Sequence, residues 1–533
     1  MLRVRWVGRV RYRDAHALQR ALFDRSPDDH LLLLEHPHVY TLGVRADPAN
    51  ILVPPADVGA ELVKTDRGGD VTYHGPGQLV GYPILTVPGK RGGGMADTVA
   101  YVRSVEQLLI DALADLGLPG AGRLDGYPGV WIEDRKVAAI GVRLSRGRTM
   151  HGFALNVDPD LSYFDHIVPC GIRDKRATSL AAEGVNAGMR TVVDAVIARA
   201  TERWGVGGVE RQDVVWREHR DEPLRLRGRL AEAGVAEGLS IDARKPDFVK
   251  ARLRITDDYV RLKRTMRDLS LVTVCEEAGC PNIFECWAAG TATFMINGER
   301  CTRACGFCLV DTRHPFPIDE SEPTRVAEAV ERMGLRFAVI TAVARDDLED
   351  GGAAAFAATI RSIRQRTPHV RVEVLIPDCK GDPAALATIF DAAPDVVNHN
   401  IETVARLQRV VRPSASYARS LAVLSRAKEA GHTTKSGIIL GLGEREDEVV
   451  GALADLRSVG VDIVTIGQYL RPTDHHLPVA RWWTPDEFER LRRAGEALGI
   501  GHVEASPLTR SSYHAAEAAN ASLQISPRSV RAV

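Results

Sequence analysis

The sequence predicts two domains of different fold class. The first is an α+β domain with a largely antiparallel or mixed sheet. The second is an α/β domain built as a partial or full (β/α) barrel. The 533 residues suit two to four domains. Short apolar, β-prone runs fill the chain up to about residue 220, and strand–helix alternation begins after about residue 320.

The β-prone runs of the first half are separated by turns that contain glycine or proline. They read LLLLEH, VYTLG, GQLVGYPIL, GVWI, KVAAIGVRL and MHGFALNV. Helices are expected at 98–116, ending before Gly117, and at 191–204. Arginines alternate with apolar residues over 1–14, a pattern that favours a strand at a sheet edge over a transit peptide.

The second half has the repeat expected of βα units. One helix should begin at Thr484, an N-cap followed by Pro485 and by Glu487 three residues after the cap. We place the first domain at 1–220, a linker rich in charges and glycine at 221–244, and the second domain at 245–533. The expected strands are 337–341, 372–376, 396–401, 436–442, 462–467 and 502–506.

Composition narrows the class of protein. The formal net charge of −1 gives no electrostatic basis for binding nucleic acid or an anionic membrane. The sequence has no apolar window long enough to span a bilayer and no secretory signal, so we expect a cytoplasmic protein. Six of the eight cysteines fall between Cys275 and Cys308. Such clustering in a large chain indicates a metal site and not a disulfide framework.

Cys301, Cys305 and Cys308 form a C-x3-C-x2-C motif. Three thiolates would leave one iron of a [4Fe–4S] cluster open to a small molecule. The alternative is a zinc site, but structural zinc usually takes four protein ligands in paired C-x2-C knuckles. The spacing therefore favours iron and sulfur.

This motif resembles that of the radical S-adenosylmethionine enzymes. A second trio in CEEAGCPNIFEC, together with GTATFMI, NHNIET, TKSGIILGLGE and RSSYHA, resembles the lipoyl synthase family in particular. The resemblance implies two [4Fe–4S] clusters and S-adenosyl-L-methionine, whose cleavage gives a radical that removes hydrogen from unactivated C–H bonds. It also implies that the second, auxiliary cluster donates sulfur, and that reduced ferredoxin or flavodoxin supplies electrons. The implied auxiliary ligands are Cys275, Cys280, Cys286 and Ser512, and Asn398, His399, Asn400 and Glu402 are candidate contacts to S-adenosylmethionine.

Cys170 and Lys136 are the candidate reactive residues of the first half. Cys170 lies between Pro169 and Gly171 in an expected loop, where a thiol can be exposed. A nearby cation such as Lys136 would favour its thiolate form. The segment RGGDVTYHGPGQ is rich in glycine, but it lacks the GK[ST] ending of a phosphate-binding loop.

Taken with EHPHVYTLG, HGFALNV and PCGI, these motifs resemble octanoyltransferases of the biotin/lipoate protein ligase fold. The resemblance makes Cys170 the acyl-accepting nucleophile. It implies a ping-pong reaction from octanoyl-acyl carrier protein to the lysine of a lipoyl domain, in E2 subunits of 2-oxoacid dehydrogenases or the glycine cleavage H protein. The implied substrate-binding residues are Arg67, Gly68, Gly69, Asp70, Val71, Thr72, Tyr73, His74, Ala139, Ile140, Gly141, His151, Gly152 and Phe153.

The two resemblances name consecutive steps of lipoate biosynthesis, because the product of the first half would be the substrate of the second. Three alternatives stay open. The first half can be an ATP-dependent lipoate ligase, one half can be a non-catalytic module, or the chain can join two neighbouring reading frames.

Overall fold

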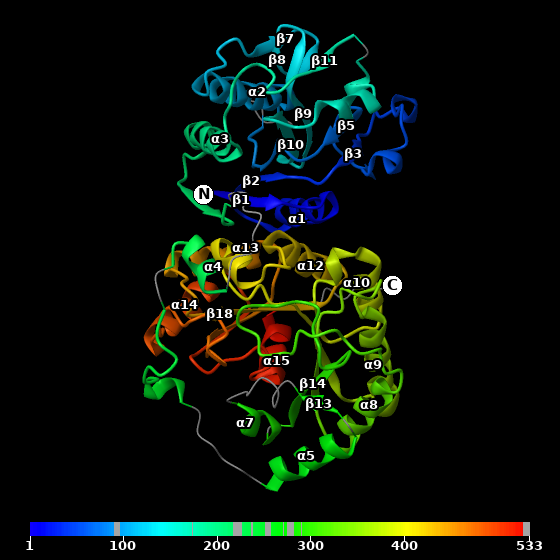
Figure 1. The fold of residues 1–533 in the computed structure, drawn as a ribbon, viewed down its shortest axis with the longest axis vertical. Coiled ribbons are helices and arrows are strands. Elements are labelled where there is room, and N and C mark those ends of the chain that lie inside the picture. The colour runs from blue at the N-terminus through cyan, green and yellow to red at the C-terminus, as the bar shows by residue number, and fades with distance from the viewer. Residues whose placement is uncertain are drawn as a thin grey trace. The chain divides into compact units, whose positions relative to one another are not determined.

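The computed structural model describes residues 1–89, 96–172, 174–216, 226–235, 238–250, 257–269, 271–273, 282–288 and 290–525. The chain divides into two compact units, Met1–Trp216 and Arg217–Val533 (Figure 1). Within the described parts, none of the helices combines the length and the apolar character that a membrane-spanning segment requires.

The first unit is built on a nine-stranded mixed sheet. Its strands run in the order β12-β1-β2-β6-β10-β9-β8-β7, with β11 paired to β9, and a small sheet of order β4-β3-β5 accompanies it. The predicted α+β class with a mixed sheet is confirmed. The strands are β1 (Leu2–Arg9), β2 (Asp29–Glu35), β3 (Val39–Leu42), β4 (Glu61–Lys64), β5 (Val71–His74), β6 (Gln78–Ile84), β7 (Gly122–Leu124), β8 (Tyr127–Ile132), β9 (Arg135–Ser145), β10 (Arg148–Asn156), β11 (Arg176–Ala177) and β12 (Val209–Asp213).

Three helices pack against this sheet: α1 (Tyr12–Arg25), α2 (Thr98–Asp115) and α3 (Met189–Trp204). Both predicted helices are present, and the Asp97 side chain caps α2 by accepting hydrogen bonds from two backbone N–H groups. The expectation of an edge strand at the N-terminus is wrong, because β1 lies between β12 and β2. Its Arg3 and Arg5 are buried and form ion pairs with Glu210 of β12.

The second unit contains seven parallel strands, β14 to β20 in chain order, with β13 antiparallel at one edge. The described strands form an open sheet, so the predicted barrel is a partial one. The strands are β13 (Val272–Thr273), β14 (Thr291–Ile296), β15 (Phe337–Ala342), β16 (Arg371–Leu375), β17 (Val396–Asn398), β18 (Thr433–Leu440), β19 (Ile463–Gln468) and β20 (His502–Ala505).

Helices cover this sheet and fill its inner side. In Figure 1, α8, α9, α10, α12 and α13 follow one another around the outside of the second unit. On the inner side, Ala515 and Ala519 of α15 pack against Phe337 and Val339 of β15. The helices are α4 (Leu226–Glu232), α5 (Asp257–Asp268), α7 (Ile283–Ala288), α8 (Glu322–Arg332), α9 (Ala353–Arg366), α10 (Pro383–Asp391), α11 (Gln408–Val411), α12 (Tyr417–Glu429), α13 (Glu446–Ser458), α14 (Pro485–Ala497) and α15 (Ala515–Ile525).

All six strands expected in the second half are present, and the capping box of α14 forms as predicted. β17 ends at Asn398, three residues earlier than expected, so residues 399–401 lie beyond the carboxyl end of that strand. The extent of the linker stays a prediction, because the structure describes only part of 221–244. That part includes α4 and Leu239, whose N–H donates to the carbonyl of Val479, 2.6 Å away.

Candidate active sites

Cys170 and Lys136 come together in the first unit. The Lys136 Nζ lies 3.6 Å from the Cys170 Sγ and donates to it. On its other side the same ammonium lies 4.6 Å from the centre of the Trp131 ring, a distance at which a cation is attracted to the ring face. Lys136 enters the site near the start of β9, and Cys170 lies on the short helical turn Pro169–Gly171. The predicted pair is therefore within reach of a common substrate.

The turn that carries Cys170 is held by the segment around Asn50. The Val168 N–H donates to the Asn50 carbonyl at 2.7 Å, and the Asn50 side-chain amide donates to Asp70 at 2.7 Å. Cys170 has a φ of 58°, a left-handed conformation that is costly for a residue with a side chain. At Gly171 a Cβ would lie 2.9 Å from Asp70, so glycine is needed there. Asp70 thus supports the cysteine turn, a role that the sequence did not indicate.

Cys170 lies where two cavities meet. The larger, which we name the Tyr12 cavity, is lined by Tyr12, Val80 and Tyr82 and by most of the residues predicted to bind substrate. Val71 and Tyr73 are exceptions, because side chains alternate along β5 and these two face an apolar cluster around Tyr40. The predicted residues in the wall are Arg67, Gly68, Gly69, Asp70, Thr72, His74, Ala139, Ile140, Gly141, His151, Gly152 and Phe153.

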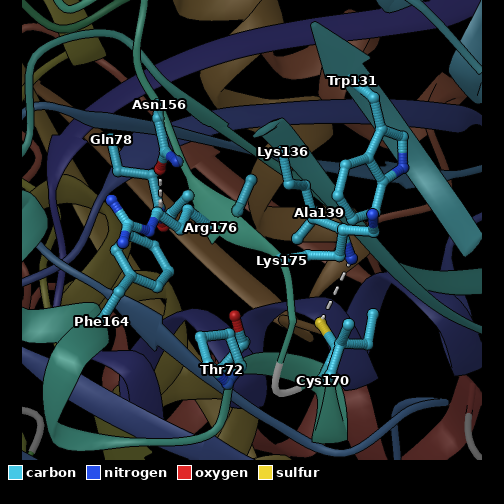
Figure 2. A pocket seen from close by; sticks show the side chains of 14 residues that line it. Thr72, Gln78, Trp131, Lys136, Ala139, Asn156, Phe164, Cys170, Lys175 and Arg176 are labelled. Carbon is cyan, nitrogen blue, oxygen red and sulfur yellow. Dashed lines mark hydrogen bonds between the residues drawn. The ribbon is translucent and has the colours of Figure 1, made fainter. Parts of the chain in front are cut away.

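The second cavity lies on the Lys136 side of Cys170, and we name it the Trp131 cavity (Figure 2). Its volume of about 30 Å³ makes it narrow. It shares four residues with the Tyr12 cavity: Thr72, Ala139, Ala154 and Cys170. Its other lining residues are Gln78, Trp131, Lys136, Asn156, Phe164, Pro169, Ile172, Lys175, Arg176 and Ala177.

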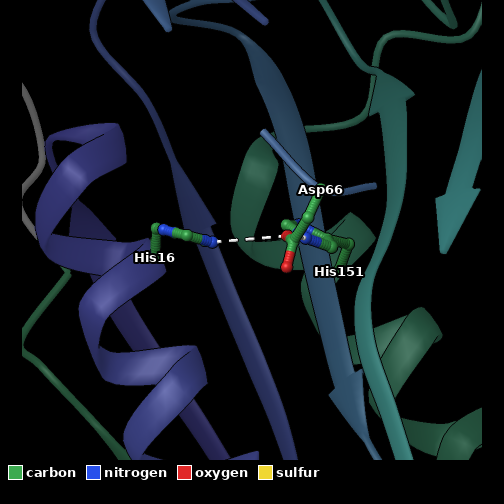
Figure 3. A group of neighbouring side chains, drawn as sticks. All are labelled: His16, Asp66 and His151. Carbon is green, nitrogen blue, oxygen red and sulfur yellow. Dashed lines mark hydrogen bonds and ion pairs between the residues drawn. The ribbon is translucent and has the colours of Figure 1, made fainter. Parts of the chain in front are cut away.

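His16, Asp66 and His151 form a cluster beside the Tyr12 cavity (Figure 3). The His151 Nε2 lies 2.7 Å from the Asp66 carboxylate, which also pairs with Arg143. Burial lowers the pKa of His16 to about 4 and also lowers the pKa of His151, so both rings are neutral near pH 7. The hydrogen bond from His151 holds the pKa of Asp66 well below its usual range. The positive field of Arg143 disfavours a metal cation here, so we interpret the cluster as a rigid polar wall.

The three cysteines of the C-x3-C-x2-C motif line a cavity of about 400 Å³ in the second unit. Their loop follows β14, at the carboxyl ends of the parallel strands, where ligands bind in open α/β sheets. Backbone hydrogen bonds join this loop to other segments. The Gly306 N–H donates to the Val411 carbonyl at 2.8 Å, and the Gly306 carbonyl accepts from the Leu477 N–H at 2.9 Å. The His476 ring also lies within hydrogen-bond distance, 2.9 Å, of the Cys308 carbonyl.

Arg303, between the first two cysteines, anchors the loop to two carboxylates. It donates two hydrogen bonds of 2.7 Å to Asp346 and one of 2.6 Å to Asp378. Asp378 is fully buried, and burial alone would raise its pKa, but the neighbouring Arg303 lowers it to about 2. Sequence analysis had not singled out Arg303, although its place inside the motif was the signal that could have identified it.

Asn400 and Glu402 lie in the same cavity as the cysteines, as expected. The Asn400 amide donates to Glu402 at 3.0 Å, while its buried Oδ1 has no hydrogen-bond partner among the described residues. Arg412 supplies a cation to this wall and donates to the Asn400 carbonyl at 2.9 Å. Three thiols, a free amide acceptor and a guanidinium around one cavity fit a [4Fe–4S] cluster with an open iron and an amino acid ligand on it.

Two other candidate contacts have structural partners. His399 is buried, with one ring nitrogen 2.8 Å from the Ile376 carbonyl and the other 3.0 Å from the Ser420 hydroxyl, although its side chain also borders the cavity. Asn398 instead donates to buried Glu373 at 2.9 Å. These bonds favour a structural part for both residues.

The expected auxiliary site is described only in part. Cys275 and Cys280 lie outside the described residues. Cys286 lies on α7, half-buried, and Ser512 lies just before Tyr513 near the end of the unit. The Tyr513 hydroxyl is 3.3 Å from the carboxylate of Glu285, the neighbour of Cys286. The structure therefore brings the segments of Cys286 and Ser512 together, and their role as cluster ligands stays a prediction.

Comparison with known proteins identifies three regions. Residues 11–201 match the family model of the lipoyl protein ligase A/B catalytic domain. Residues 226–280 match the N-terminal domain of lipoyl synthase, and residues 295–456 match the radical SAM superfamily. Lipoyl synthase of Rubrobacter xylanophilus is 60% identical over 275 residues, which cover 51% of this chain and 86% of that protein. The chain belongs to the lipoyl synthase family.

A second bacterial lipoyl synthase shows a similar degree of identity. Lipoyl synthase of Mycobacterium tuberculosis is 55% identical over 272 residues, covering 51% of this chain and 88% of that protein. Members of the family use S-adenosylmethionine and [4Fe–4S] clusters, which agrees with the three clustered cysteines at 301, 305 and 308. Among solved structures, a bi-partite lipoate protein ligase of Thermoplasma acidophilum is 16% identical, with a TM-score of 0.32, covering 40% of this chain and 87% of that one.

Proposed function

We propose that this lipoyl synthase also carries an octanoyltransferase, so that one chain performs two consecutive steps of lipoate biosynthesis. The first unit would move an octanoyl group from octanoyl-acyl carrier protein to the lysine of a lipoyl domain. The second would insert two sulfur atoms into that group. The observation that carries the proposal is the Lys136–Cys170 pair, 3.6 Å apart at the meeting point of two cavities.

The transfer needs only acyl exchange. The Cys170 thiolate adds to the thioester carbonyl, the C–S bond to the pantetheine sulfur breaks, and that sulfur leaves as a thiol after taking a proton from the Lys136 side. The neutral lysine amine of the lipoyl domain then adds to the Cys170 thioester, its proton passes to the Lys136 amine, and the amide bond forms as the C–S bond to Cys170 breaks. This restores the Lys136 ammonium beside the Cys170 thiolate, where it lies between Trp131 and Cys170 and stabilises the negative charge on the sulfur.

An ATP-dependent ligase is the alternative for this unit, and one feature favours the transferase. The described wall contains a cysteine beside a lysine, which ligation through an adenylate does not need.

In the lipoyl synthase unit, the cysteines at 301, 305 and 308 would hold the cluster that binds S-adenosylmethionine. When bound, these groups supply the radical that removes hydrogen from an unactivated C–H bond. Asn400 and Arg412 would orient the amino and carboxylate groups of S-adenosylmethionine, and buried Glu402 would hold the Asn400 amide in place. Cys275, Cys280, Cys286 and Ser512 would hold the second cluster, the source of sulfur.

The proposed partners follow from this chemistry. They are octanoyl-acyl carrier protein, the lipoyl domains of E2 subunits of 2-oxoacid dehydrogenases, the glycine cleavage H protein, and reduced ferredoxin or flavodoxin as electron donor. These proteins are soluble, which agrees with the cytoplasmic location that we propose.

The test supplies the reconstituted full chain with octanoyl-acyl carrier protein, an unmodified lipoyl domain, S-adenosylmethionine and a reductant. The mass of the lipoyl domain is then measured by mass spectrometry. We expect an octanoyl adduct without S-adenosylmethionine and a lipoyl adduct with it. If octanoylation requires ATP and free octanoate, the first unit is a ligase and the proposal is wrong.

A further inference from the structure

We propose that the Trp131 cavity is the arm subsite of the transferase, the channel through which the pantetheine thiol leaves Cys170 and the lysine amine reaches it. The octanoyl chain would meanwhile stay in the Tyr12 cavity. This inference rests on the proposed function, and it adds a separate site for a narrow, unbranched arm ending in a thiol or an amine.

The position of Lys136 assigns the two cavities. In acyl exchange, the leaving sulfur and the entering nitrogen occupy the same side of the carbonyl carbon, and both exchange a proton there. Lys136 is the cation that donates to Cys170, and it lines the Trp131 cavity and not the Tyr12 cavity. The leaving and entering atoms must therefore lie on the Trp131 side. The acyl chain is left with the Tyr12 cavity, which is also lined by Cys170 but not by Lys136.

The walls of the Trp131 cavity suit such an arm. Trp131, Ile172 and Ala177 offer apolar surface to a chain of methylene groups. Lys175 and Arg176 add positive charge to the same wall. Positive charge favours the thiolate form of a departing pantetheine thiol, and it favours the neutral, nucleophilic form of an entering lysine amine.

Ala177 offers a way to block this cavity alone. It pairs with Lys136 across β11 and β9, it is half-buried, and it lines the Trp131 cavity only. A phenyl ring at this position would occupy the channel without replacing a reactive group. Ile140 of β9 is the matched control, because it is also half-buried and lines the Tyr12 cavity only.

The experiment compares the full chain with its Ala177→Phe and Ile140→Phe variants. Three rates are measured by intact-protein mass spectrometry: octanoylation of Cys170 by thioesters of acyl carrier protein and of N-acetylcysteamine, transfer from octanoyl-Cys170 to a lipoyl domain, and alkylation of Cys170 by iodoacetamide. Thioesters of six, eight and ten carbons give the chain-length preference.

We expect Ala177→Phe to slow both half-reactions by about tenfold or more, equivalent to roughly 1.4 kcal/mol in each barrier. Chain-length preference and alkylation should stay as in the unaltered chain, while Ile140→Phe should shift the preference toward shorter chains. The subsite assignment is overturned if Ala177→Phe changes chain-length preference, or if it leaves both half-reactions unchanged. The milder Ala177→Leu substitution gives the same comparison if the phenylalanine variant does not fold. Failure of Cys170 in the unaltered chain to accept the octanoyl group from its thioesters would instead overturn the proposed function.

Discussion

Replacement of Lys136 by methionine removes the positive charge next to Cys170 and keeps most of the side-chain volume. With 3.6 Å between the Lys136 Nζ and the Cys170 Sγ, Coulomb's law gives about 5 kcal/mol at an effective dielectric constant near 20 and about 1 kcal/mol in bulk water. Because Cys170 is only half-buried, a value of about 2 kcal/mol is reasonable. That energy corresponds to a factor of about thirty in the stabilisation of negative charge on the Cys170 sulfur.

The rate of alkylation should fall by less than this factor. Without the neighbouring cation the sulfur anion is a stronger nucleophile, which offsets about half of the logarithmic loss, so iodoacetamide should react about fivefold more slowly with Lys136→Met. Octanoyl transfer should fall by about a hundredfold or more, because the variant also lacks a proton donor for the leaving sulfur.

The control for this experiment is Lys175→Met, which removes another cation of the same cavity that does not donate to Cys170. Its alkylation rate should change by less than about twofold, as expected for a more distant and partly exposed charge. Equal alkylation rates in the unaltered chain and in Lys136→Met would refute the electrostatic argument. Equal losses in alkylation and transfer would refute the second role, as proton donor.

The other predictions concern the separation of the two sites and the support of the cluster loop. Cys170→Ala should stop octanoyl transfer and leave iron content unchanged, whereas Cys305→Ala should stop cleavage of S-adenosylmethionine and leave transfer unchanged. Loss of both activities in either folded variant would contradict two independent sites. Arg303→Met leaves buried Asp378 without its main partner, so we expect a destabilisation of about 3 kcal/mol or more and a lower iron content per chain after anaerobic reconstitution. Unchanged iron content and stability would show that the loop does not depend on this pair. Since the pKa of Asp378 lies at about 2, below its ordinary value near 4, its charge stabilises the fold above pH 4, and this stabilisation is lost as the pH falls toward 2. The stability of Asp378→Asn, measured by acid unfolding and tryptophan fluorescence, should therefore depend less on pH between pH 4 and pH 2. The same pH dependence in the variant and in the unaltered chain would contradict the predicted direction of this effect.

Local patterns were sufficient to predict the βα repeats of the second unit. Strands such as β15 and β19 are short apolar runs between capped amphipathic helices, and their length and spacing identify them. β14 (Thr291–Ile296) was not predicted as a strand, although its residues lie in the GTATFMI motif. The N-terminal strand was recognised, but its neighbours were not. Pairing of β1 with β12 joins residues about 200 positions apart, which no local pattern reveals.

Motifs also predicted which residues reach the candidate sites, but not what holds them there. Cys170 and Lys136 were recognised from their surroundings and prove to be in contact. The sequence did not indicate the hydrogen bond between Asp70 and Asn50 or the contact between His16 and Asp66. These contacts exist only after strands and loops from distant parts of the chain have come together. Supporting residues of this kind are polar, partly buried and widely separated, so sequence alone leaves them indistinguishable from surface residues.

In the proposed pair of steps, one chain would need no passage for a free intermediate. The reactive form of the octanoyl group is the thioester, and in the proposed mechanism it exists only on the carrier protein and on Cys170, within the first unit. The product that leaves this unit is an amide, which is stable in water, and it stays attached to a lipoyl domain. Its octanoyl chain carries unactivated C–H bonds, the kind that a radical enzyme can attack. The lipoyl domain could therefore dissociate and bind again without loss of the acyl group, and one chain supplies equal amounts of the two units without requiring direct transfer between their sites.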